Sequence, residues 1–262
     1  MSERRPNDQL SHDQLQTAAR AVARAKRLAV FTGAGVSKES GIPTFREPET
    51  GLWAQYDPME LATPGAYFRD PAFVWSWYEH RFGALAAAEP NPGHRALAEL
   101  EQLLPCVTVI TQNIDGLHQR AGSTDVVELH GSMQRFKCIG ERHTGFRMDD
   151  LVDQDEKPPR CPECGDLMRP DVVWFGEALP GDAIDRAQVL SVRCDVMLVV
   201  GTSGVVYPAA AMPLLAAQAG AVVIDVNPER DALAAAAGIF LRGAGGEVLP
   251  ELVAAVRQHL AA

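Results

Sequence analysis

Short apolar runs alternate along the chain with longer stretches in which apolar residues recur every three or four positions. The runs are almost wholly apolar, as in a parallel sheet covered on both faces, and they predict strands over 28–32, 107–111, 126–129, 196–200 and 221–226. The amphipathic stretches predict helices over 10–26, 73–85, 95–104, 181–191, 207–219 and 247–259. This alternation predicts a doubly wound, Rossmann-like α/β fold.

Composition narrows the class of protein further. A chain of 262 residues can bury one substantial core, with a smaller lobe beside it. The net charge of −10 argues against nucleic acid as the main partner, because no basic stripe is present to bind phosphates. No apolar run approaches the ~20 residues that span a bilayer. The first residues also lack the apolar stretch of a secretory signal, so we expect a cytoplasmic protein with no membrane partner.

Three dense segments follow predicted strands. The first is Gly33-Ala-Gly-Val-Ser-Lys-Glu-Ser-Gly-Ile-Pro-Thr-Phe-Arg-Glu47, the second is Thr111-Gln-Asn-Ile-Asp-Gly-Leu-His118, and the third is Glu128-Leu-His-Gly131. A glycine-rich turn after a strand lets backbone N–H groups approach a phosphate, although a Gly-x-Gly alone can be only a tight turn. The first segment continues into an apolar and cationic stretch that a plain strand-to-helix turn does not need.

Together these segments resemble the sirtuin family of NAD-dependent protein-lysine deacylases, from about Leu28 to about Leu252. The resemblance implies an NAD-binding domain made of 1–46, 95–130 and 171–262. The segments 47–94 and 131–170 would form a smaller domain, part helical and part zinc-ribbon-like. Sirtuins transfer the acyl group of acyl-lysine to ADP-ribose and release nicotinamide, so acyl-lysine proteins are the expected partners.

By this resemblance His130 is the general base, since an imidazole titrates near neutrality and can take a proton from a ribose hydroxyl. Asn113 would orient the ribose or a water, and Asp115 would hold the nicotinamide amide. The other histidines, including His118, lie in no comparable setting. The expected NAD contacts are Gly33, Ala34, Gly35, Thr44, Phe45, Arg46, Gln112, Asn113, Ile114, Asp115, Gly201, Thr202, Ser203, Asn227, Glu229 and Gly245.

Tyr78 and Arg81 stand three apart and share one face of a predicted helix, which by itself is typical of a surface pair. They resemble the Tyr-x-x-Arg of sirtuins that remove succinyl and malonyl groups, in which the arginine binds the acyl carboxylate and the tyrosine hydroxyl adds a hydrogen bond. The resemblance thus implies a preference for succinyl and malonyl groups, with acetyl-lysine as a further possible substrate. Ala62 matches the small residue that leaves room for the acyl chain. Two further segments resemble those that hold the substrate peptide as an added strand, and they contribute Val173, Trp174, Phe175, Gly176, Glu177, Val206 and Tyr207.

A cysteine cluster predicts a structural zinc site with one uncertain ligand. Cys161-Pro-Glu-Cys164 is typical of a zinc knuckle, and Cys138 offers a third thiolate. The family's usual arrangement has two Cys-x-x-Cys pairs, but this chain has Glu141 where the fourth cysteine would fall. Glu141 or His143 could complete the tetrahedron, or the loop could fold without metal. The remaining cysteines, 106 and 194, are predicted to be small core residues.

Two other functions stay open at this level. A mono-ADP-ribosyltransferase would use the same NAD chemistry on a different nucleophile. A non-catalytic NAD-sensing protein would share the fold, but the intact set of His130, Asn113 and Asp115 argues against it. The oligomeric state cannot be inferred from the sequence.

Overall fold

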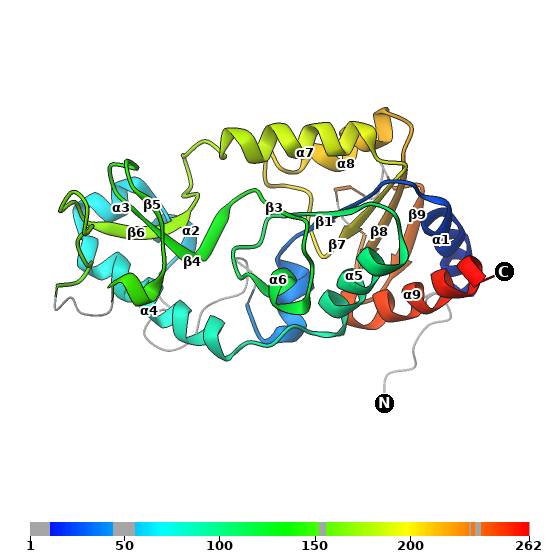
Figure 1. Ribbon diagram of the computed structural model, residues 1–262, viewed down its shortest axis with the longest axis horizontal. Coiled ribbons are helices and arrows are strands. Elements are labelled where there is room, and N and C mark those ends of the chain that lie inside the picture. Colours follow the sequence, from blue (N-terminus) through cyan, green and yellow to red (C-terminus); the bar gives the residue numbers. More distant parts are fainter. Residues whose placement is uncertain (1–10, 44–55, 152–155, 231, 234–236, 262) are drawn as a thin grey trace.

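A six-stranded sheet with the order β3-β2-β1-β7-β8-β9 forms the centre of the larger part of the molecule (Figure 1). The computed structural model describes residues 11–43, 56–151, 156–230, 232–233 and 237–261. The strands are β1 (Leu28–Thr32), β2 (Val107–Thr111), β3 (Val126–Glu128), β7 (Val196–Val200), β8 (Val222–Asn227) and β9 (Ile239–Arg242), all paired in parallel. The strand order reverses between β1 and β7, and ligands of α/β sheets bind beside such a switch point.

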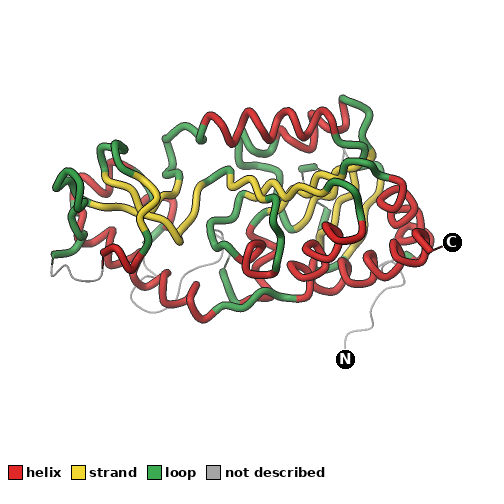
Figure 2. Tube along the Cα trace, in the orientation of Figure 1, coloured by secondary structure: helices red, strands yellow, loops and turns green. Residues whose placement is uncertain are grey.

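Helices cover both faces of this sheet, as Figure 2 shows. One face carries α1 (His12–Arg24), α5 (Pro92–Leu103) and α9 (Gly245–Ala261), and the other carries α7 (Gly181–Arg193) and α8 (Ala211–Gln218). Side chains of β1 alternate between the two cores, because Leu28 and Val30 belong to the first and Ala29 and Phe31 to the second. The predicted doubly wound α/β fold is therefore confirmed. Within the described residues, no helix has both the length and the apolar character needed to cross a membrane.

The described part of the other end of the molecule contains three α-helices and a three-stranded antiparallel sheet (Figure 1). The helices are α2 (Pro58–Leu61), α3 (Pro64–Arg69) and α4 (Pro71–Ala87), and the strands in sheet order are β5 (Thr144–Phe146), β4 (Gly131–Cys138) and β6 (Met168–Val172). They share an apolar core in which Tyr67 and Tyr78 pack with Val172 and Trp174. The Tyr67 hydroxyl donates to the backbone oxygen of Met168 at 2.6 Å, which joins α3 to β6.

Side-chain caps fix where the helices near the site begin. The Asp70 carboxylate accepts a backbone N–H of the first turn of α4 at 3.0 Å, and the Asn91 amide oxygen accepts one in α5 at 2.9 Å. Pro71 and Pro92 follow these caps, at a position where the missing N–H breaks no helical hydrogen bond. The start of α4 in turn sets which face of the helix presents Tyr78.

Several elements differ from those that periodicity predicts. The strand β9 and the strands of the antiparallel sheet are not predicted, because they are short or lie in polar sequence where the pattern is weak. The helix α8 begins at Ala211 and not at 207, since residues 207–210 form turns. Cys106 is exposed, so its prediction as a core residue is wrong, whereas Cys194 is buried. The remaining short elements are η2 (Ala34–Ser40), α6 (Leu117–Ala121) and η4 (Met148–Leu151).

Candidate active site

The loops that follow β1 and β7 pack tightly together at the switch point of the sheet. The backbone N–H of Gly33 donates to Val200 O at 3.1 Å, and that of Gly35 donates to Gly201 O at 2.8 Å. A Cβ atom on Gly35 would lie 2.6 Å from Gly201 O, and one on Gly33 would lie 2.8 Å from Thr202 Cβ. Both glycines are therefore required for the contact between the two loops. This requirement is separate from any close approach of their backbone to a phosphate.

Three carboxamide side chains join the neighbouring loops. Asn113 Nδ2 donates to Gly33 O at 3.1 Å, and Gln112 Nε2 donates to Thr202 Oγ1 at 3.0 Å. Asn227 Nδ2 donates to Thr202 O at 2.8 Å. These predicted NAD contacts come from the carboxyl ends of β1, β2, β7 and β8, and the structure brings them to one edge of the sheet. Glycine turns and amide donors at such an edge fit a dinucleotide.

The other predicted NAD contacts lie in four different settings. Gly245 is buried at the start of α9, where a Cβ atom would lie 3.1 Å from a Val200 methyl group. Glu229 is exposed after β8. Three residues are partly buried in the same loops: Ala34, Ile114 and Ser203. Three others lie outside the described residues: Thr44, Phe45 and Arg46.

The ring of His130 is oriented by the backbone of the neighbouring loop. Its Nδ1 lies 2.9 Å from Gln112 O. Because a carbonyl oxygen only accepts hydrogen bonds, Nδ1 carries the proton and Nε2 of the neutral ring is the basic nitrogen. Burial lowers the pKa of His130, and the hydrogen bond to Gln112 partly opposes this shift. The base form is consequently the populated form at neutral pH.

The turn after His130 requires glycine. Gly131 has a φ of 75°, and a Cβ atom there would collide with Asp171 O. This close approach lets β4 pair with β6, and the chain after β6 donates the Val173 N–H to His130 O at 2.9 Å. The antiparallel sheet thus holds the backbone of His130.

A buried polar network supports Asn113 and Asp115. The Ser37 hydroxyl donates to Asp115 Oδ2 at 2.6 Å and accepts from Asn113 Nδ2 at 3.1 Å. The Leu117 backbone N–H donates to Asp115 Oδ1 at 2.9 Å. Burial raises the pKa of Asp115, while these two hydrogen bonds to its carboxylate favour the charged form. Ser37 therefore fixes two of the three side chains to which we assign catalytic roles.

Ser37, His94 and His118 belong to this network, although the sequence interpretation assigns none of them a role. His94 Nε2 lies 3.4 Å from Ser37 Oγ, and His118 Nε2 lies 2.9 Å from Thr32 Oγ1. Burial lowers the pKa of His94 to about 4 and that of His118 to about 3, so both are neutral at pH 7. His118 thus lies beside the site loops, buried against Thr32, and not in a setting comparable to that of His130. Its place three residues after Asp115 is the signal that could have indicated it.

Two of the predicted acyl-contacting residues are buried in the core shared by α2, α4 and β6. Ala62 is 5% exposed and Tyr78 is 2% exposed. The Tyr78 hydroxyl accepts a hydrogen bond from Trp174 Nε1 at 2.8 Å, and Phe175 N donates to Ala62 O at 2.8 Å. The reading of Tyr78 as a surface residue is therefore excluded.

The segment predicted to bind the substrate peptide is less extended than expected. Strand β6 ends before it, and Glu177 N donates to Trp174 O at 3.0 Å to close a turn in which Gly176 has a φ of 90°. The edge that can pair with an added strand is therefore short. On the second segment, Val206 and Tyr207 are 41% and 65% exposed, so both are accessible to a partner.

Four side chains beyond β4 form a cluster of metal-ligand type: Cys138, His143, Cys161 and Cys164. Their ligand atoms all lie within 4.8 Å of one another, and His143 Nδ1 is 3.6 Å from Cys161 Sγ. Tetrahedral zinc separates such atoms by about 3.3–3.8 Å, so small side-chain movements complete the site. Glu141 does not join it, because its Oε1 lies 2.7 Å from Lys137 Nζ and its side chain is 56% exposed. The cluster suggests zinc, and the structure resolves the two candidates for the fourth ligand in favour of His143.

Comparisons with known proteins agree with this geometry. Residues 33–208 match the model of the Sir2 family. NAD-dependent protein deacylase 2 of Pyrobaculum aerophilum is 54% identical over 239 residues, which cover 91% of this chain and 94% of that protein. A solved Sir2 homologue in complex with NAD has a TM-score of 0.87 and 46% identity over 96% of both chains. Sir2Af2 bound to a myristoylated histone peptide has a TM-score of 0.75 and 38% identity over 95% of this chain and 98% of that one. The chain therefore belongs to the Sir2 family of NAD-dependent protein deacylases.

Proposed function

We propose that this chain removes acidic acyl groups, such as succinyl and malonyl, from lysine side chains of proteins. When bound, NAD supplies the ribose carbon that the acyl oxygen attacks and nicotinamide as the leaving group. Protein substrates are supported by the similarity to Sir2Af2, which was solved with an acylated histone peptide. The acidic preference is supported by the setting of Tyr78 and Arg81.

One observation carries the proposal, namely that the segment 173–175 connects the proposed base to the proposed acyl pocket. Val173 donates its backbone N–H to His130 O at 2.9 Å. Trp174 donates its indole N–H to the Tyr78 hydroxyl at 2.8 Å. Phe175 donates its backbone N–H to Ala62 O at 2.8 Å. A lysine side chain that reaches His130 along this segment would have its acyl end beside Tyr78.

The chain's own groups supply positioning and proton transfer. His130 Nε2 is the basic nitrogen and takes the proton of a ribose hydroxyl in the proposed mechanism. Asn113 and Asp115 are 8% and 5% exposed, and their hydrogen bonds to Ser37 hold them in place. Oriented polar groups in a buried site stabilise developing charge more strongly than water does.

Arg81 supplies the charge that an acidic acyl group requires. It lies three residues after Tyr78 in α4, so the two side chains share one face of the helix. Its guanidinium carbon lies 5.0 Å from the centroid of the Trp77 ring, which places the cation over an aromatic face. A guanidinium binds a carboxylate through an ion pair and two parallel hydrogen bonds, whereas a neutral acetyl group can form neither of these interactions.

Replacing Arg81 with methionine is expected to lower kcat/KM for succinyl-lysine by roughly 100-fold and to change that for acetyl-lysine by less than about threefold, because loss of one charged partner costs 2–5 kcal/mol. Steady-state kinetics with NAD and one peptide carrying acetyl-, succinyl- or malonyl-lysine test this. Arg69→Met is the matched control, since Arg69 is exposed at the end of α3. Equal losses on acetyl- and succinyl-lysine would refute the carboxylate-binding role.

The same assay distinguishes the proposed deacylase activity from mono-ADP-ribosyl transfer, which is the main alternative. Release of nicotinamide in the presence of a protein acceptor, without deacylation of any of the three peptides, would support mono-ADP-ribosyl transfer and contradict the proposed function. Turnover of acetyl-lysine alone would retain the deacylase activity and contradict the acidic preference.

The pH profile should show the depressed pKa of His130. Because burial lowers this pKa below its ordinary value of 6.5, the basic form persists to lower pH, and kcat/KM is expected to fall only below pH 6.5. An acetyl-lysine peptide is the right substrate, since its acyl group has no proton of its own to titrate. Incubating the enzyme at each pH and assaying it at pH 7.5 controls for unfolding. An acid limb centred above pH 6.5 would contradict the assigned base.

A further inference from the structure

The Tyr78 hydroxyl is buried and, among the described residues, makes one hydrogen bond. It accepts the indole N–H of Trp174 at 2.8 Å, yet no described residue accepts its own proton. Tyr67, a second buried tyrosine of the same core, behaves differently, because its hydroxyl donates to Met168 O at 2.6 Å. Native proteins rarely leave a buried donor without an acceptor. The unused proton of Tyr78 therefore indicates a ligand that supplies an acceptor.

The bond from Trp174 also decides where that proton points. A phenol keeps its O–H near the plane of the ring, so the proton has two favoured directions and the oxygen accepts from the remaining side. The indole of Trp174 occupies one side, since its N–H can only donate. The Tyr78 proton is thereby directed to the other side. Burial raises the pKa of Tyr78 to about 12, so the hydroxyl keeps this proton at neutral pH.

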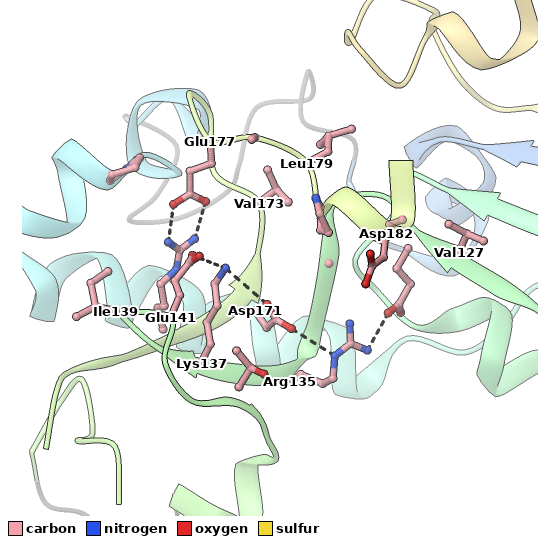
Figure 3. Close-up of a pocket in the computed structure, with 18 of the residues that line it drawn as sticks. Val127, Arg135, Lys137, Ile139, Glu141, Asp171, Val173, Glu177, Leu179 and Asp182 are labelled. Carbon is pink, nitrogen blue, oxygen red and sulfur yellow. Dashed lines mark hydrogen bonds and ion pairs between the residues drawn. The ribbon is translucent and has the colours of Figure 1, made fainter. Parts of the chain in front are cut away.

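The indole of Trp174 is itself held by a partly buried ion pair on the wall of a groove of about 990 Å³ (Figure 3). The Arg169 guanidinium lies 3.2 Å from the centroid of the Trp174 ring. It donates two parallel hydrogen bonds to Glu177 at 2.6 and 2.9 Å, drawn in Figure 3 at the two Glu177 oxygens. Glu177 also accepts the Trp174 backbone N–H at 2.8 Å. The indole cannot turn away from Tyr78 without losing these contacts.

We propose that Trp174 is a positioning residue for acyl selectivity: its indole N–H presets the Tyr78 hydroxyl as a donor to the carboxylate of an acidic acyl group. The Arg169–Glu177 pair holds the indole in the orientation that contacts Tyr78. This inference rests on the proposed function, because it concerns the same acyl pocket. It adds the residue that makes Tyr78 a donor in advance, so that no reorientation is needed when the substrate enters.

The test is the Trp174→Phe variant, which keeps an aromatic ring against Arg169 and removes the N–H. We expect KM for succinyl-lysine to rise about fivefold more than KM for acetyl-lysine, because both substrates share the peptide contacts of this segment and a neutral hydrogen bond contributes about 1 kcal/mol. Trp75→Phe is the matched control, because Trp75 is buried in the neighbouring cluster and packs on Phe82 and Phe136. If Trp174→Phe does not fold, replacing Trp174 by benzothienylalanine removes the N–H with the ring shape kept.

A double-mutant cycle with Tyr78→Phe separates the inference from the proposed function. If Trp174 acts through Tyr78, its substitution should add little to the succinyl effect once Tyr78 is phenylalanine. If Trp174→Phe lowers succinyl-lysine activity as much in the Tyr78→Phe protein as in the wild type, the positioning role is overturned. It is also overturned if Tyr78→Phe lowers the preference for succinyl-lysine while Trp174→Phe leaves that preference unchanged. If the wild-type protein has no preference for succinyl-lysine and Tyr78→Phe changes nothing, the proposed function fails and this inference fails with it.

Discussion

Replacing His130 with tyrosine is expected to lower kcat for every acyl-lysine peptide by about 10³-fold or more, because a phenol is protonated at neutral pH and cannot take the ribose proton. His94 and His118 are not expected to replace it, because both are buried and contact the hydroxyl groups of Ser37 and Thr32. Deacylation of an acetyl- and a succinyl-lysine peptide, followed by mass spectrometry, measures the loss.

The matched control for this variant is His12→Tyr, since His12 is exposed at the start of α1, far along the chain from the site loops. Thermal unfolding should show both variants folded, because the His130 ring makes one hydrogen bond to the described part of the chain. A folded His130→Tyr protein that still removes succinyl groups at near wild-type rate would disprove the assignment of the base.

Replacing His143 with alanine is expected to lower zinc affinity by at least about 100-fold and to reduce the melting temperature, because metal binding and folding of a small metal-bound lobe are coupled. The three cysteines that remain can hold zinc only with an open fourth position. Zinc content after dialysis against a chelator, measured by elemental analysis, and a melting curve with and without added zinc give both quantities.

Glu141→Gly is the control for this second substitution. Glu141 has a φ of 55°, a conformation that glycine adopts without strain, so the backbone of the turn is kept while the carboxylate is removed. We expect this variant to retain its zinc. Loss of zinc from Glu141→Gly with retention in His143→Ala would reverse the assignment of the fourth ligand.

The NAD-binding edge is the part of the site that the sequence predicts best. Gly33, Asn113, Thr202 and Asn227 are far apart in the chain, but each follows a predicted parallel strand. The carboxyl ends of parallel strands meet at one edge of a sheet, so the fold prediction alone places these residues together. The hydrogen bonds among them bear out that placement, while their contacts to NAD stay a prediction.

The polar network below that edge is not predicted, because its members come from separate elements. His94 lies in the first turn of α5 and meets Ser37 of η2, and no local pattern connects the two. The fourth ligand of the metal site is not fixed by the sequence either, although the two candidates lie close together in the chain. Spacing allows both Glu141 and His143 as ligands, and the conformation of the turn between β4 and β5 decides between them by directing Glu141 toward Lys137.

The sequence by itself determined the fold class, the family resemblance and the identity of most residues around the NAD loops. It could do so because apolar periodicity and glycine-rich motifs act on the backbone within a few residues. Only the tertiary structure decided which side chains meet: that His143 completes the cysteine cluster, and that Tyr78 is buried against Trp174, 96 residues away in the chain. Such contacts depend on how distant elements pack, and packing leaves no periodic signal in either segment.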